Sequence, residues 1–234
     1  MPASASKGLE AVPTPTGIYE ALHAYFGDLD WWPANGPFEV MVGAILTQRT
    51  AWRNVELAMA NLREAGVIDG PSLLALPRRR LEGLIRSSGT YRQKAERLQE
   101  LMGAVETIGG SMDGFLDMPT SAQRGHLLAV RGIGPETADS ILLYAAGRPV
   151  FVVDAYTRRV LDRLHVDPGG SYDDVARWFT EGLPEDAALF NNYHATLVEL
   201  AKAFCRTEPM CGGCPLLIMC PTGTSESSGT RSEP

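Results

Sequence analysis

The chain has 234 residues, of which 44% are hydrophobic and 21% charged, and this length is enough for one large core or two small lobes. Its formal net charge of −7 excludes a strongly basic nucleic-acid binder, since neutralising phosphates requires an excess of Lys and Arg. No run approaches the ~20 apolar residues of a membrane span and the N-terminus shows no signal-peptide pattern, so we expect an intracellular, cytoplasmic protein away from membranes.

Both ends of the chain lack side chains that could form a core. Residues 1–14 and 221–234 are rich in Ser, Pro, Ala, Gly and Thr, a composition typical of disordered tails. After the first tail, apolar residues recur at helical spacing over 17–25, which predicts a helix. A second helix is expected after Pro37, because residues 38–46 are apolar on every side and should therefore be buried.

Polar and aromatic residues surround the end of that buried helix. Gln48 stands where the helix emerges, and an amphipathic helix is expected over 54–62. Core packing is the commoner fate of tryptophan, although an aromatic face can also stack on a planar group. Three tryptophans flank the segment: Trp31, Trp32 and Trp52.

The next stretch predicts helices joined by a glycine loop. Residues 72–85 and 92–108 show helical spacing, and the loop over 87–91 between them contains Gly89. Arginines gather in this part of the chain and again over 148–163. They offer a local basic patch despite the acidic total, and a solvated helix face is the alternative interpretation.

A helix, a glycine-rich turn and a second helix are predicted over 126–147. Gly132 and Gly134 permit positive φ and close approach of another backbone, and Ile133 between them can plug the two helices together. Pro135 suits the first position of the second helix, whose free N–H groups carry the positive end of the helix dipole. Because such a terminus favours a phosphate oxygen, the turn indicates a non-specific contact with a DNA backbone.

A short extended run over 150–153 leads to Asp154. This aspartate could simply cap the helix that follows, a role that aspartate often fills. Helical spacing returns over 172–180 and 191–204. No β pattern competes with any of these helices, so the fold should be all-α.

All cysteines of the chain lie in one segment with the spacing C-x5-C-x2-C-x5-C: Cys205, Cys211, Cys214 and Cys220. Disulfides are not expected in an intracellular chain, and four thiols this close in sequence converge readily on one centre. A zinc site is the alternative, but such sites more often pair two C-x2-C knuckles. Four thiolates wrapped in a single loop fit a [4Fe–4S] cluster well.

Taken together, these motifs resemble the helix-hairpin-helix (HhH-GPD) DNA glycosylase superfamily, in its endonuclease III-like branch with an iron–sulfur loop. The matching residues are Gly132, Ile133 and Gly134 in the hairpin, followed by Val153 and Asp154. The run WWPA…PFEVMVGAILTQ is in addition similar to the 3-methyladenine DNA glycosylase III subgroup, which removes alkylated purines. The family's cysteine spacing is C-x6-C-x2-C-x5-C, so this chain is one residue shorter in the first interval.

The resemblance implies a role for several residues. Asp154 would be the catalytic carboxylate, which stabilises the positive charge on the sugar or activates water as the glycosidic bond breaks. Gln48 would fill the gap that an extruded nucleotide leaves in the duplex, and the three tryptophans could stack on the extruded base. The hairpin, with Arg131, would contact the DNA backbone, and the cluster loop would place Arg206 near it.

Two positions depart from the family pattern. Bifunctional members carry a lysine two residues after the second hairpin glycine, which attacks the sugar; here that residue is Glu136, which cannot form a Schiff base. Glu136 suits the first turn of a helix, and it could also take part in base recognition. The family's wedge position, beside Tyr91, is Thr90, a poor wedge. The sequence therefore predicts a monofunctional glycosylase that leaves an abasic site.

We thus expect a two-lobed all-α monomer. A helical barrel over 38–148 would hold the helix-hairpin-helix (about 118–147), and a cluster lobe would combine 15–37 with 149–220. Double-stranded DNA with a damaged base, an alkylated purine, would lie in the cleft between the lobes of a nucleoid-associated enzyme, and a downstream AP endonuclease would cut the strand. The alternatives are a bifunctional endonuclease III-type glycosylase acting on oxidised pyrimidines and a catalytically weak damage-binding protein.

Overall fold

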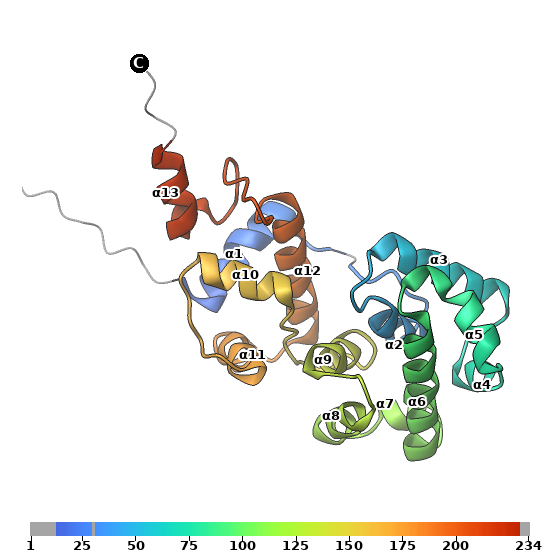
Figure 1. The fold of residues 1–234 in the computed structure, drawn as a ribbon. Helices are drawn as coiled ribbons and strands as arrows, with labels where there is room; N and C mark the ends of the chain where they lie inside the picture. The colour runs from blue at the N-terminus through green and yellow to red at the C-terminus, as the bar shows by residue number, and fades with distance from the viewer. Residues whose placement is uncertain (1–12, 30, 230–234) are drawn as a thin grey trace, which may run out of the picture. The chain divides into compact units, whose positions relative to one another are not determined.

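The computed structural model describes residues 13–29 and 31–229, and every regular element in this part of the chain is a helix (Figure 1). The all-α fold class predicted from the sequence is confirmed. The chain divides into two compact units. The hairpin unit comprises the described residues of 30–152 together with 186–191, and the cysteine unit comprises the described residues of 1–29, 153–185 and 192–234. None of the helices in the described residues is long and apolar enough to cross a membrane.

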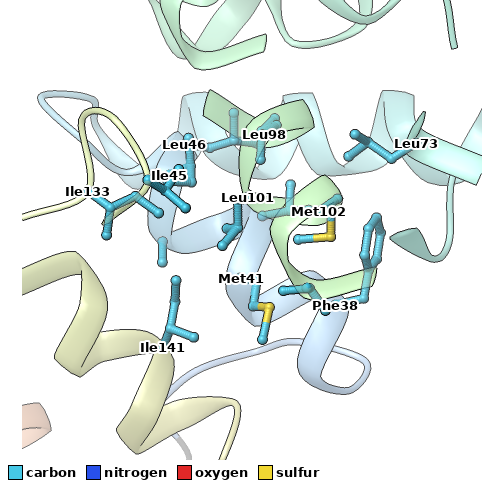
Figure 2. Packing of buried hydrophobic residues seen from close by; sticks show 14 of the residues in the cluster. Phe38, Met41, Ile45, Leu46, Leu73, Leu98, Leu101, Met102, Ile133 and Ile141 are labelled. Carbon is cyan, nitrogen blue, oxygen red and sulfur yellow. The ribbon is translucent and has the colours of Figure 1, made fainter. Parts of the chain in front are cut away.

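The hairpin unit contains α2 (Pro37–Leu46), α3 (Trp52–Glu64), α4 (Gly70–Leu74), α5 (Arg78–Leu84), the 3-10 helix η1 (Arg86–Ser88), α6 (Tyr91–Gly109), α7 (Met112–Leu116), α8 (Thr120–Ala129) and α9 (Pro135–Tyr144). Helix α2 is central: its residues from Phe38 to Leu46 are all buried, as its apolar sequence predicts, and it packs against α3, α6 and α9. Figure 2 shows side chains of α2 and α6 meeting Ile133 and Ile141 in this core. Removing one such fully buried side chain costs about 2–5 kcal/mol.

The cysteine unit is built around residues 192–203 of α12 (Ala187–Ala203), whose residues up to 191 belong to the hairpin unit. Its other helices are α1 (Pro15–Phe26), α10 (Ala155–Arg163), α11 (Tyr172–Glu181), η2 (Leu217–Met219) and α13 (Pro221–Gly229). Tyr193 of α12 is fully buried, and its hydroxyl donates to the carbonyl of Pro15 at 3.0 Å. Thr14 caps α1 by accepting from the N–H of Gly17 at 3.1 Å. The first and last parts of the chain thus share one core.

Three expectations about the elements need correction. The single helix predicted over 72–85 is broken into α4 and α5, because Pro77 cannot continue a helix and instead caps α5. The loop predicted over 87–91 begins within η1. The disordered tail predicted from 221 is wrong over 221–229, where α13 starts at a proline and the Thr222 hydroxyl donates to the Arg163 carbonyl at 2.9 Å. The tail residues 1–12 and 230–234 lie outside the described residues.

Candidate active site and DNA-contact residues

The glycine hairpin joins α8 to α9, and of its two glycines only Gly132 has the positive φ expected from the sequence, since Gly134 has φ −94°. Gly132 has φ +84°, and a Cβ placed there would lie 2.1 Å from Nε of Arg97, so any other residue would have a strained backbone and would displace the Arg97 side chain. Ile133 is buried in the core of the hairpin unit. Gly134 precedes Pro135, the first residue of α9, and leaves the first N–H groups of that helix without a side-chain cap. The free amides and the helix dipole favour an anion at this point.

Gln48 is held against the hairpin by both ends of its amide group. Its Nε2 donates to the Gly132 carbonyl at 3.3 Å and to the Thr137 hydroxyl at 3.1 Å, while its Oε1 accepts from Arg97 at 2.6 Å. The neighbouring Arg131 is exposed, and its guanidinium pairs with Glu96 at 2.5 Å. The structure therefore brings Gln48 and the hairpin together, as two parts of one surface of the hairpin unit.

The loop that follows η1 has an unusual backbone. Gly89 has φ +63°, and Thr90 also lies in the left-handed region at φ +32°, a conformation that non-glycine residues rarely adopt. Thr90 is exposed, and Tyr91 lies between the guanidinium groups of Arg86 and Arg92, at 5.9 and 5.8 Å from its ring centre. The loop thus presents a small polar tip beside an aromatic ring and two cations.

Two tryptophans line a pocket of about 510 Å³ on the hairpin unit. Trp32 packs against Tyr144, with ring centres 4.8 Å apart, and meets Trp52 edge-on at 5.8 Å. The Trp32 ring also fits against Gly43 of α2, where an added Cβ would lie 3.3 Å from the indole. Trp32 therefore both packs against the core and lines the pocket, where it could stack on a base. Trp31 is not among the residues that line this pocket.

A partly buried ion pair, Glu39 with Arg63, forms the polar side of this pocket. Both carboxylate oxygens of Glu39 accept from Arg63 at 2.6 Å, and one also accepts from the Asn35 N–H at 2.7 Å. The hydrogen bonds from Arg63 hold the pKa of Glu39 below its usual value against the opposing effect of burial. Sequence reasoning missed this pair, because a lone glutamate within an apolar helix was the only signal.

Asp154 immediately precedes α10 as its N-cap residue, and most of its side chain is buried. Its Oδ1 accepts from the N–H and the hydroxyl of Thr157 at 2.7 and 2.9 Å, which confirms the capping role. Its Oδ2 lies 3.6 Å from Nε2 of His194, a buried residue of α12. Burial raises the pKa of Asp154, but His194 and the hydrogen bonds from Thr157 outweigh it and hold the pKa below its usual value. The carboxylate is therefore ionised at neutral pH.

His194 was not singled out from the sequence. Its signal is its position in α12, where it lies next to Tyr193 on a helix whose neighbouring residues are buried. A histidine in such an environment needs a polar partner, and Asp154 supplies one. Asp154 thus contacts residues of two helices, Thr157 of α10 and His194 of α12.

No lysine of the described residues stands in the position that would form a Schiff base. Glu136 is exposed in the first turn of α9, where its carboxylate suits the helix dipole. Lys94 is buried and hydrogen-bonded in the hairpin unit, and Lys202 pairs with Glu199 at 2.9 Å. Lys7 lies outside the described residues.

The four cysteines are half-buried thiols on one segment that runs from the end of α12 past η2 to the start of α13. Burial raises the pKa of the Cys214 thiol, and the neighbouring Cys205 and Cys220 raise it further. Arg163 of α10 donates to Cys205 Sγ at 3.1 Å, and its carbonyl accepts from Cys220 at 3.4 Å. The described residues contain no group of three His, Cys, Asp or Glu side chains already arranged around a metal. The donor set itself fits a metal with soft ligands.

Arg206 follows directly after the first cysteine. It is exposed, and its Nε donates to the carbonyl of Lys202 at 2.7 Å. This contact extends the C-terminal end of α12 and leaves the outer part of the guanidinium facing solvent. Arg206 therefore remains a DNA-contact candidate on the cysteine unit, as its sequence position predicts.

Residues 42–185 match the HhH-GPD superfamily of base excision DNA repair proteins. The chain belongs to this superfamily. It is 43% identical over 206 residues to MJ1434 of Methanocaldococcus jannaschii, named as a DNA repair glycosylase, with 87% of this chain and 94% of the relative covered. Endonuclease III of Thermotoga maritima is 32% identical over 187 residues, which are 79% of this chain and 82% of the relative. The family resemblance drawn from the sequence is confirmed.

Solved structures show the same architecture. A 3-methyladenine DNA glycosylase from H. pylori, bound to 1,N6-ethenoadenine, superimposes with a TM-score of 0.73 at 29% identity, covering 81% of this chain and 98% of that chain. Endonuclease III in a non-covalent complex with DNA gives a TM-score of 0.77 at 24% identity, with 92% and 99% coverage, and supports the fold alone. The protein is therefore a DNA glycosylase by family, a hydrolase-type enzyme of base excision repair.

Proposed function

We propose that the protein is a monofunctional DNA N-glycosylase that flips an alkylated purine out of double-stranded DNA and hydrolyses its glycosidic bond. The observation that carries the proposal is Asp154, a carboxylate kept ionised while most of its side chain is buried. Breaking the bond builds positive charge on the sugar, and a fixed carboxylate stabilises that charge better than water does. The same oxygen could take a proton from the attacking water.

The two oxygens of Asp154 have different partners, which supports a division of roles. Oδ1 is used by Thr157 and fixes the carboxylate at the start of α10. Oδ2 faces His194 at 3.6 Å, longer than a strong hydrogen bond, so this oxygen keeps capacity for a sugar or a water molecule. His194 orients the carboxylate and keeps it charged, and in this proposal it does not itself touch the substrate.

The pocket beside Trp32 and Trp52 supports the assignment of a purine base. Its volume of about 510 Å³ exceeds that of a single base, and aromatic faces are suited to stack on a base taken out of the helix. A purine alkylated at ring nitrogen N3 or N7 carries positive charge, which an electron-rich indole face favours. The ligand-bound H. pylori 3-methyladenine DNA glycosylase supports the same substrate class. Trp31 precedes Trp32 in the sequence, and we propose that it makes an additional contact with the extruded base.

The DNA contacts are proposed on both units. On the hairpin unit they are Gln48, Arg131, the turn 132–134, and the tip formed by Thr90 with Tyr91; on the cysteine unit the contact is Arg206. The amides that open α9 would bind a phosphate, and Gln48 would enter the duplex where the damaged nucleotide leaves it. Base release would leave an abasic site, and a separate AP endonuclease would cut the strand.

We also propose that the four cysteines hold a [4Fe–4S] cluster. The support is chemical: four thiols lie on one short segment, and Cys205 and Cys220 are close enough to Cys214 to raise the pKa of its thiol. Arg163 is hydrogen-bonded to both Cys205 and Cys220. When bound, the cluster would supply structural order to 205–220. Arg163 would offset the charge of the thiolates and fasten their segment to α10.

Replacing Asp154 by Asn tests the catalytic role. Asparagine caps a helix as well as aspartate does, so the variant should still fold, although it loses the stabilising charge opposite His194. Base release should fall by about 10²–10⁴-fold because the charge is lost. Affinity for duplex DNA should be retained. Single-turnover base release and a binding titration on one lesion duplex measure both quantities. Normal base release by the variant would sink the assignment.

Duplexes with single lesions test the substrate class and the missing strand cleavage. End-labelled duplexes with a 3-methyladenine analogue, hypoxanthine, thymine glycol or a plain abasic site are incubated with the protein and read with and without alkali. Bands seen only after alkali, on the alkylated purine, are the expected result. Cleavage of thymine glycol duplexes without alkali would instead favour the bifunctional alternative, and binding without base release would favour a damage-binding protein.

A further inference from the structure

Lys94 is a fully buried cation whose three hydrogen-bond partners are all neutral. Its ammonium group donates to the carbonyl of Leu46 at 2.8 Å, to the hydroxyl of Thr50 at 2.7 Å and to the carbonyl of Ser88 at 2.6 Å. An ammonium has three N–H groups, so each of them has one acceptor. Leu46 ends α2, where the helix dipole is negative, and this offsets part of the cost of burying the charge.

The residues that Lys94 holds belong to two separate segments of the hairpin unit. Thr50 ends the turn that carries Gln48, and Ser88 precedes the loop that carries Thr90. The Thr50 hydroxyl also donates to the Ser88 carbonyl, so the two segments meet directly over the ammonium. The Lys94 ammonium is hydrogen-bonded to both residues, Thr50 and Ser88.

Both segments contain a non-glycine residue with left-handed backbone. Arg49, next to Gln48, has φ +53°, and Thr90 has φ +32°. Such conformations persist only where surrounding contacts fix them, and they concentrate at functional sites. Lys94 contacts both segments: its ammonium group bonds to Thr50, next to Arg49, and to Ser88, and its backbone N–H donates to the Thr90 carbonyl at 3.1 Å. One side chain thus bonds to Thr50 and Ser88, which are 38 residues apart and lie within two residues of the strained Arg49 and Thr90.

We propose that Lys94 is a positioning residue that fastens the Gln48 turn and the Thr90 loop into one rigid DNA-contacting element. The inference rests on the proposed function, which assigns DNA contact to those two segments. Lys94 itself is buried and touches no DNA; it acts through the loops above it. Without it, each loop would sample other backbone conformations, and binding DNA would carry the cost of ordering them.

A pH dependence follows from the same geometry. Burial lowers the pKa of Lys94 to about 8, and the nearby charge of Arg97, on the next turn of α6, lowers it as well. The cations on the two fastened segments, Arg49 and Arg86, are exposed. A neutral amine has two N–H groups and one lone pair, so one of its three acceptors would lose its donor. DNA affinity should therefore fall as the pH rises through about 8.

The test compares Lys94→Met, which keeps the length of the side chain and removes the charge, with Lys202→Met as the matched control on the cysteine unit. Hydrogen exchange is measured first without DNA. Lys94→Met should exchange about tenfold faster at the amides of 47–50 and 88–90, while the remaining core stays protected. Lys202→Met should match the native protein. Because this arm needs no DNA, it tests the positioning role even if the proposed function fails.

DNA affinity is then measured between about pH 6.5 and 9.5, a range that brackets the pKa of Lys94. The native protein and Lys202→Met should lose affinity for a duplex with an abasic-site analogue as Lys94 deprotonates. Lys94→Met should bind about tenfold more weakly at neutral pH and show no such step. Global stability should move the opposite way, because losing a buried charge between about pH 8 and the ordinary value of 10.5 favours the folded state.

A DNA affinity that falls while the stability of the fold rises with pH would distinguish a positioning role for Lys94 from a general structural role. A native affinity that does not change through about pH 8, or unchanged loop exchange in Lys94→Met, would overturn the proposal. If Lys94→Met does not fold, Thr50→Val replaces it. This variant removes one acceptor and the direct link to Ser88, and it should speed exchange in both segments; exchange that stays slow in either segment would again overturn the proposal.

Discussion

Asp154 combines a structural and a chemical role because each of its oxygens has its own environment. One oxygen closes the first turn of α10, and the other faces His194. Since the pKa of this carboxyl group is held below its usual value, its contribution to stability is present above the pKa of the unfolded chain and is lost only as the pH falls through the lower folded value. The catalytic form should therefore persist in mildly acidic solution.

Replacing Glu136 by lysine tests whether the absent lysine explains the expected lack of strand cleavage. Glu136→Lys places an amine two residues after the second hairpin glycine, where bifunctional relatives carry their nucleophile. The site is exposed in a first helical turn, so the change should cost less than about 1 kcal/mol of stability. We expect the variant to gain strand cleavage at abasic sites and a covalent adduct trapped by borohydride. Glu136→Gln is the control and should gain neither.

The hairpin glycines make a matched pair for a stability test. Gly132→Ala would bring a Cβ against the Arg97 guanidinium at a left-handed position, and it should lower the free energy of unfolding by about 1–3 kcal/mol. Gly134→Ala should be nearly neutral, because φ is −94° and nothing lies within 4 Å of the added atom. Urea denaturation of both variants measures the difference. Equal losses of unfolding free energy in the two variants would show that neither the positive φ nor the contact with Arg97 explains the glycine at position 132.

At the scale of single residues, the candidate catalytic and DNA-contact residues could be predicted from the sequence, but the buried residues that hold them in position could not. The positive φ of Gly132 and the cap at Asp154 follow from local rules and are confirmed, whereas Gly134 has neither a positive φ nor a close neighbour. His194 and Lys94 could not be predicted, because their partners lie far away in the chain and their roles depend on burial. A buried polar side chain becomes informative only when its environment is known.

At the scale of elements, α2 and α3 are joined by a partly buried ion pair. Arg63→Met would leave the Glu39 carboxylate buried without its cation, and we expect a loss of about 2–4 kcal/mol, somewhat reduced because Arg63 is partly exposed. Because the pKa of Glu39 is lowered, the stabilisation is present above the ordinary value of 4.5 and disappears as the pH falls below it. Thermal unfolding of both proteins at neutral and acidic pH should show the difference shrinking in acid.

Helix positions could be predicted better than helix ends. The apolar run of α2 and the periodic pattern of α6 were strong local signals. The break at Pro77 and the helix α13 were missed, the second because its composition is that of a tail and its stability comes from contacts with Arg163. Such tertiary contacts override local propensity.

At the scale of the whole molecule, metal content is the decisive property of the cysteine segment. Protein purified without oxygen should contain about four iron and four sulfide ions per chain, and Cys214→Ser should lower this content. Chelation should destabilise the cysteine unit before the hairpin unit, since ligand binding to the folded state adds to its stability. Zinc without iron or sulfide would favour the alternative metal site. Spectroscopy and metal analysis on the same sample give the answer.

The division of the chain has a consequence for its synthesis. The buried residues Ile18 and Leu22 of α1 belong to the cysteine unit, and Tyr193 bonds to Pro15 across 178 residues. The main cluster of buried hydrophobic residues in the hairpin unit, in contrast, lies within 38–142. At about 5–20 residues per second, the apolar face of α1 waits on the order of ten to thirty seconds for its partners. During translation this helix is thus a natural target for chaperones, while the segment behind it can already fold on the ribosome.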